Sequence, residues 1–216
     1  MRIRVVLQIA AVALVVVILA PVAPASAANL HAGRTWGDPA GNAYGVRADL
    51  TTPESQPTMY SGFISGWVST STVNGMWAQT GWDYVKGAGT PSSYVEGYHT
   101  GGVYYGYYVG QPMSAWNFTR AYEVRWNAAM WRFDLYIVGT YRDYSVVTGG
   151  APLGVQCESE SYDSRNKLNT PNFRTVQHAD SLLTYWPFDS RGAWVEESTY
   201  YVPSKTYYYQ YDTNWH

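Results

Sequence analysis

Short stretches in which apolar and polar residues alternate recur along this chain, and they restrict the fold more than any other feature. The clearest stretch covers residues 129–138, where Trp131, Phe133, Leu135 and Ile137 fall on one face and mainly polar residues on the other. A period of two is that of a β-strand with one face on a core. We therefore expect a strand here, with these four side chains buried.

Similar runs follow at short intervals and are separated by turn signals such as Asn74-Gly75 and Gly101-Gly102. No segment shows helical periodicity over more than two turns. Tyr and Trp contribute 21 and 10 residues, and such side chains suit pleated, half-buried surfaces. The sequence therefore predicts an all-β, two-sheet antiparallel sandwich or barrel. The expected strands are 60–69, 76–85, 93–99, 103–109, 122–126, 129–138, 141–147, 155–162, 172–179, 198–202 and 206–211, with a hairpin turn at 126–129.

The first 27 residues have the organisation of a secretory signal peptide. Arg2 and Arg4 precede an apolar run, and Ala25-Ser26-Ala27 supplies the small residues of a cleavage site. We expect cleavage after Ala27, or after Ala28, and a secreted, extracellular product. The alternative is an uncleaved membrane anchor, although the run is short of the roughly 20 residues that span a bilayer.

The remaining chain is long enough for one domain, which we divide into an N-terminal arm over 28–58 and a β-sandwich domain over 59–216. Loss of Arg2 and Arg4 leaves 12 basic side chains against 16 acidic ones, a formal charge of −4 (12 − 16). This balance gives no reason to expect a nucleic-acid partner, and no second apolar run is long enough to span a bilayer. We expect an extracellular polypeptide or polysaccharide as partner, and no membrane after signal cleavage. The single cysteine, Cys157, forms no disulfide within the chain, and we expect it to be a small buried residue.

Candidate site residues lie on two of the expected strands. On the first, Trp77, Gln79, Gly81 and Asp83 share a face, and the glycine leaves room for a ligand. On the second, Gln156, Glu158, Glu160 and Tyr162 share a face. The four histidines are scattered without the spacing of metal ligands, so we expect no metal and no cofactor.

These two strands resemble the glutamic peptidases of the eqolisin family and, in outline, the neprosin peptidases. The resemblance rests on Gln79-Thr80-Gly81-Trp82-Asp83, on Glu160 placed 81 residues (160 − 79) after Gln79, and on Gly66-Trp67-Val68 upstream. It implies a concanavalin-like jelly-roll sandwich whose concave sheet carries two catalytic side chains. The chain departs from the family at Ser71, where the family has Asp, and at Cys157 and Ser159, where the family has bulky apolar residues.

The resemblance also implies an acid-active endopeptidase. Gln79 would be the catalytic amide, Glu160 the catalytic carboxylate and Glu158 its alternative, while Trp67, Trp77 and Asp83 would support or bind the substrate. Such an enzyme activates water with the carboxylate and holds the oxyanion with the amide.

Two other functions are compatible with the same residues. Rings such as Trp77, Tyr104 and Tyr108 on one sheet could stack on sugars, as in a lectin-like binding module without activity. Glu158 and Glu160 could also serve as the carboxylate pair of a glycosidase, although such pairs usually come from different strands. The sequence leaves open whether the protein is an enzyme.

Overall fold

The computed structural model describes residues 30–37, 43–72, 74–109, 113, 116–146, 150, 152–163, 166, 172–187, 192–195, 199–204 and 207–211. The predicted signal peptide lies outside this set. The described residues form fifteen β-strands and no helix. None of them belongs to a helix long and apolar enough to cross a membrane.

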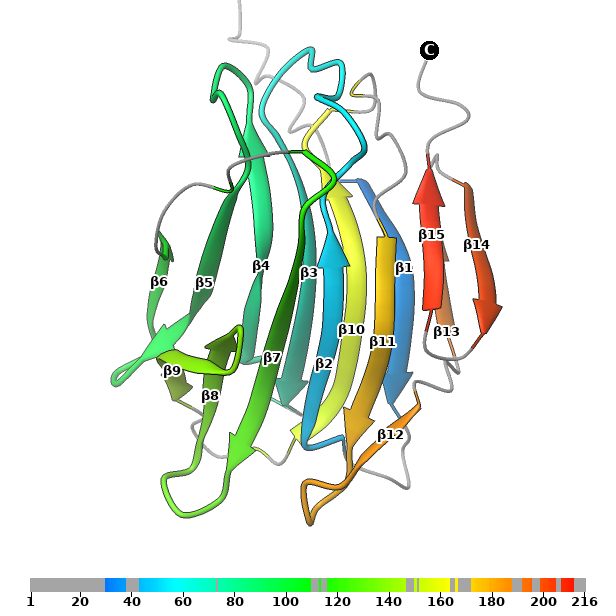
Figure 1. Ribbon diagram of the computed structural model, residues 1–216. Helices are drawn as coiled ribbons and strands as arrows, with labels where there is room; N and C mark the ends of the chain where they lie inside the picture. Colours follow the sequence, from blue (N-terminus) through cyan, green and yellow to red (C-terminus); the bar gives the residue numbers. More distant parts are fainter. Residues whose placement is uncertain are drawn as a thin grey trace, which may run out of the picture.

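The strands form two antiparallel sheets that stack face to face (Figure 1). The first sheet has the order β13 (Gly192–Val195), β1 (Leu30–Gly37), β10 (Pro152–Ser161), β3 (Phe63–Thr72), β4 (Trp77–Val85), β5 (Ser92–His99) and β6 (Val103–Tyr108). The second has the order β14 (Thr199–Ser204), β15 (Tyr207–Tyr211), β11 (Asn172–Ala179), β2 (Gly45–Thr51), β7 (Thr119–Asn127), β8 (Arg132–Ile137) and β9 (Thr140–Val146). A short strand, β12 (Tyr185–Pro187), pairs with β11. The all-β sandwich expected from the alternating residues is therefore confirmed.

The core lies between the sheets and takes every second residue of the central strands. On β4, Ala78, Trp82 and Tyr84 are buried in it, and on β8 Phe133 and Leu135 are fully buried. Alternation therefore leaves the other face of β4 free to line a site. The core also includes the thiol of Cys157, as expected.

Trp131 is a correction to the predicted core, because its side chain is 60% exposed. Strand β7 continues to Asn127, and the hairpin turn occupies residues 128–131 rather than 126–129. Trp131 has a φ of 49°, which takes it out of the extended conformation and breaks the alternation before β8 begins. Its ring packs edge-on against Trp126 instead.

The segment 28–58 also differs from the expected arm. It contributes β1, which pairs with β10 and β13 in the first sheet, and β2, which lies between β11 and β7 in the second. The buried Val46, Ala48 and Leu50 of β2 belong to the core. In β2 these three residues alternate with Arg47 and Asp49, but the run is short and the Gly, Pro and Thr residues around it indicated a loosely packed arm instead.

Candidate active site

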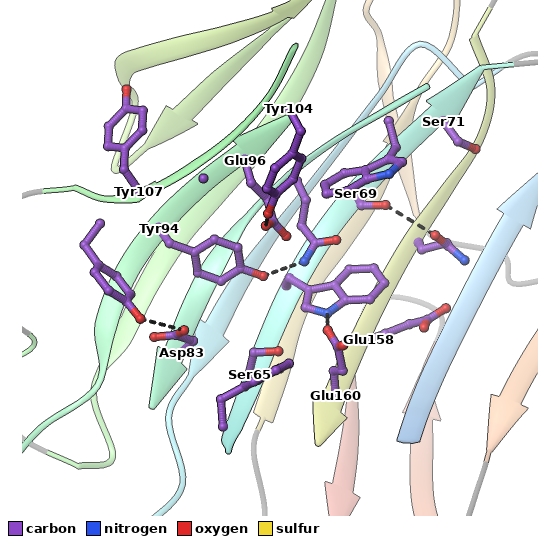
Figure 2. A pocket seen from close by; sticks show the side chains of 17 residues that line it. Ser65, Ser69, Ser71, Asp83, Tyr94, Glu96, Tyr104, Tyr107, Glu158 and Glu160 are labelled. Atoms are coloured by element: carbon purple, nitrogen blue, oxygen red, sulfur yellow. Dashed lines mark hydrogen bonds between the residues drawn. The ribbon is translucent and has the colours of Figure 1, made fainter. Parts of the chain in front are cut away.

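A cleft of about 680 Å³ lies over the first sheet, on the face turned away from the core. Its lining residues come from β3, β4, β5, β6 and β10 (Figure 2). The floor includes β3, whose residues Ser65, Ser69 and Ser71 point to this side and are small, together with residues of β4 and β5. Gly81 adds no side chain beside Trp67, its partner on β3. The cleft therefore forms where small residues occupy the middle of the first sheet, between strands that carry aromatic side chains.

The register across β4, β3 and β10 places the two candidate strands on this one cleft. Gln79 is opposite Ser69, which is opposite Gln156, while Glu158 is opposite Trp67 and Glu160 is opposite Ser65. One strand therefore separates Gln79 from the glutamates, and directly paired residues share a face. The structure thus brings together Gln79, Glu158, Glu160, Trp67, Trp77 and Asp83, all of which line the cleft. Their catalytic or binding roles remain predictions.

Gln79 is buried at the cleft floor, and its side chain is held by a tyrosine. The Nε2 atom of Gln79 donates a hydrogen bond to the hydroxyl oxygen of Tyr94 at 2.5 Å. Tyr94 is on β5, where the neighbouring cleft residue Glu96 is the direct cross-strand partner of Gln79. A primary amide has two N–H groups, so one N–H is held by Tyr94 and the other is available to a ligand.

The two glutamates of β10 have different surroundings. Glu158 is only 1% exposed, whereas the Oε2 atom of Glu160 accepts a hydrogen bond from the indole Nε1 of Trp67 at 3.3 Å. Burial raises the pKa of Tyr94 well above its usual range. The negative charges of Glu96 and, to a smaller extent, Glu160 raise this pKa further. Glu160 therefore interacts electrostatically with the hydroxyl that holds Gln79. These contacts connect Glu160 with both Trp67 and Tyr94.

Two further carboxyl groups line the cleft, and both have raised pKa values. Burial raises the pKa of Asp83 to about 6, against a lowering by the hydrogen bond from Tyr108 and with a further rise from the charge of Glu160. Burial also raises the pKa of Glu96, to about 7. The hydrogen bond from Tyr104 lowers this pKa, and the charges of Glu160 and Asp83 raise it. The donor–acceptor distances are 3.0 Å for Tyr108 and 2.7 Å for Tyr104.

The cleft is consequently acidic. Four carboxyl groups come from β4, β5 and β10, and no Lys, Arg or His is among the described residues that line it. Burial and the charges of neighbouring carboxylates raise the pKa values of Asp83 and Glu96, so these two groups hold protons into the weakly acidic range. Such a site can offer a carboxylic acid as well as a carboxylate below neutral pH.

Sequence reasoning did not identify Tyr94 and Glu96 as site residues. Their alternation within 93–99 was visible, with Tyr94, Glu96 and Tyr98 on one face. Only the register of the β4–β5 pair, which sets Glu96 opposite Gln79, brings them to the site. Trp77, which was predicted, packs near Tyr98 and Tyr104 at ring-centroid distances of 5.7 and 6.0 Å.

A Cys–His pair, a metal site and a glycosidase carboxylate pair have less support among the described residues. Cys157 belongs to the core between the sheets and His178 lies on β11 of the second sheet, so neither faces the cleft. No group of three His, Cys, Asp or Glu with the geometry of a metal site occurs among the described residues. Glu158 and Glu160 are two apart on one strand, whereas the acid and base of a glycosidase usually flank the bond from different strands.

Comparisons with known proteins give the fold a clear counterpart. No family model matches the sequence, and no curated protein matches it. Among solved structures, scytalido-glutamic peptidase with a peptide-based transition state analog matches with a TM-score of 0.61 and 14% identity, over 85% of this chain and 98% of that chain. SCP-B, described as a member of the eqolisin family of peptidases and solved with the tripeptide Ala-Ile-His, matches with a TM-score of 0.57 and 13% identity over the same shares.

The β-sandwich of the glutamic peptidases is therefore the fold of this chain, as the motif around Gln79 predicted. At this level of identity the likeness concerns the fold, and function has to be argued from the cleft itself.

Proposed function

We propose that this protein is a secreted, acid-active endopeptidase in which Gln79 and Glu160 activate water for attack on a peptide bond. The observation that supports it is the meeting of these two side chains in one acidic cleft, on a fold shared with glutamic peptidases. Secretion is supported by the signal-peptide pattern of residues 1–27.

The proposed reaction uses groups that the cleft supplies. The Glu160 carboxylate takes a proton from water as the water oxygen bonds to the peptide carbonyl carbon. The N–H of Gln79 that Tyr94 does not hold donates to the oxyanion, whose charge develops during this step. Protonated Glu160 then gives the proton to the leaving nitrogen as the C–N bond breaks, which restores the carboxylate.

The test is hydrolysis of casein by the secreted protein between about pH 2 and pH 7, a range that spans the reference carboxyl pKa values. Glu160→Gln should abolish turnover with the fold intact, and Gln79→Ala should lower kcat by roughly 10²- to 10³-fold, as loss of one oxyanion donor does elsewhere. Glu158→Gln is the matched control and should retain more activity than Glu160→Gln. Cleavage that survives in both Gln variants would refute the assigned mechanism.

A second candidate, a carbohydrate-binding module, is favoured by the rings at the mouth of the cleft. Tyr104 and Tyr108 are 56% and 54% exposed and line the cleft together with Trp77. Exposed rings of this kind can stack on sugars. If the protein cleaves nothing but is retained on an insoluble polysaccharide, and Trp77→Ala weakens that retention, the binding module is the better description.

A further inference from the structure

Strand β6 forms one margin of the first sheet and hydrogen-bonds to β5 and to no other described strand (Figure 1). Its sequence, Val-Tyr-Tyr-Gly-Tyr-Tyr, contains neither a charged residue nor a proline. Exposed edges normally carry such residues, or are very short, because an open edge accepts further strands. The other edges follow this rule: β9 carries Arg142 and Asp143, β14 carries Pro203, and β13 has only four residues.

The register shows which backbone groups of β6 face outward. Val109, just after the strand, donates its N–H to the carbonyl oxygen of Ser93 at 2.8 Å, and Tyr108 is opposite Tyr94. Hydrogen-bonded and non-bonded pairs alternate in an antiparallel ladder. The N–H and C=O groups of Tyr104, Gly106 and Tyr108 therefore point away from β5.

These three residues also line the cleft, as their neighbour Tyr107 does. The hydroxyls of Tyr104 and Tyr108 donate to Glu96 and Asp83 on the cleft floor, so the strand is tied to the site by its side chains. Each of the three residues thus lines the cleft and also has a backbone N–H and C=O that point away from β5. A polypeptide added beside β6 would continue the sheet at the rim of the cleft.

We propose that the edge of β6 binds an extended polypeptide by strand addition, through the backbone groups of Tyr104, Gly106 and Tyr108. That the polypeptide is a substrate rests on the proposed function; the pairing itself does not. Backbone pairing recognises any extended chain, with little dependence on its sequence, which suits capture of unfolded protein.

The experiment measures binding of fluorescein-labelled, unfolded casein to the Glu160→Gln protein by anisotropy, so that cleavage plays no part. Gly106→Pro in that background removes one outward N–H, at an edge position where proline is tolerated. Gly106→Ala is the matched control, because it keeps the N–H and adds a Cβ whose nearest neighbour is the flexible Tyr104 hydroxyl at 3.0 Å. We expect the Kd of the proline variant to exceed that of the alanine variant about three- to tenfold, the range for one lost hydrogen bond.

A second measurement leaves the strand untouched, in case the proline variant does not fold. A labelled synthetic casein peptide is compared with two versions methylated on alternate amides, one in each frame. Strand addition predicts weaker binding of at least one methylated frame. Equal Kd values for the proline and alanine variants, or equal binding of all three peptides, would overturn the proposal.

The remaining outcomes separate the two proposals. If Gly106→Pro changes the sedimentation of the protein alone, the edge serves a second copy of the chain, and the polypeptide proposal is wrong. If casein binds through β6 but the unmodified protein cleaves nothing at any pH, the peptidase proposal fails and the strand-addition proposal stands. If the unmodified protein cleaves casein but casein binding does not depend on β6, the strand-addition proposal fails and the peptidase proposal stands.

Discussion

At the scale of single residues, Tyr94 determines how Gln79 is presented. Its hydroxyl accepts one N–H of the Gln79 amide at 2.5 Å, and the ring is buried. Tyr94 is therefore a positioning residue for the proposed oxyanion donor, and it does not need to touch the substrate.

The prediction concerns Tyr94→Phe, which removes only the hydroxyl. We expect kcat on casein to fall about two- to tenfold with KM unchanged, since one orienting hydrogen bond contributes about 0.5–1.5 kcal/mol. Steady-state kinetics and a thermal melt test this together. A change in KM alone, or an unchanged kcat, would show that the hydroxyl does not position the amide.

Phe133 and Trp131 provide a second test at this scale, because they are two apart and were predicted to be equally buried. Phe133 is fully buried, whereas Trp131 is 60% exposed in the turn. We expect Phe133→Ala to lower the free energy of unfolding by about 3–5 kcal/mol. Trp131→Ala should cost about 1 kcal/mol or less, the range of an exposed aromatic contact. Urea denaturation of both variants measures this difference, and equal losses would contradict the assigned register of β8.

At the scale of elements, the close approach of β3 and β4 depends on Gly81. A Cβ at Gly81 would lie 2.1 Å from the carbonyl oxygen of Gly66, a distance that neither backbone can accommodate without moving. Gly81 therefore serves the packing of the cleft floor as well as leaving it open.

Gly81→Ala should destabilise the protein by about 1–3 kcal/mol or more, as overpacking does in rigid sites. Gly89→Ala is the matched control, since a Cβ there meets nothing within 4 Å and its backbone is not left-handed. Chemical denaturation compares the two. If the Gly81→Ala protein were as stable as the Gly89→Ala protein, β3 and β4 could move apart at little cost and the prediction would be wrong.

At the scale of the whole molecule, two carboxyl groups of the cleft make the stability of the folded protein depend on pH. The pKa of Asp83 rises from 3.8 to about 6 and that of Glu96 from 4.5 to about 7, chiefly because both are buried. The folded protein then binds more protons than the unfolded chain between about pH 4 and pH 7, so stability falls as the pH rises through this window.

We expect the Tm to be higher at pH 4 than at pH 7, by roughly 3–6 °C, the scale of one to two kcal/mol in a chain of this size. The Asp83→Asn, Glu96→Gln double variant should show a smaller difference between the two pH values, because its amides do not titrate. Thermal melts followed by circular dichroism test both statements. An equal pH dependence in the double variant would place its origin outside the cleft.

Much of the architecture was predictable from local patterns, because alternation reports directly which residues face a core. The strands around Gln79 and Glu160 and their cleft-facing sides could all be identified in this way. The motif from Gln79 to Asp83 also indicated the family of folds that the comparisons confirm. Trp131 was placed wrongly because a positive φ in the turn ended the alternation, and no residue-level pattern signals that event.

The tertiary structure alone decided which strands are neighbours, and with them the content of the cleft. Sequence order does not say that β10 lies beside β3, or that β1 and β2 enter different sheets. Nor does it set Glu96 opposite Gln79 or bring the charge of Glu160 to Tyr94. The physical reason is that side-chain alternation is a local property of one strand. The pairing of strands distant in sequence depends instead on how the whole core closes.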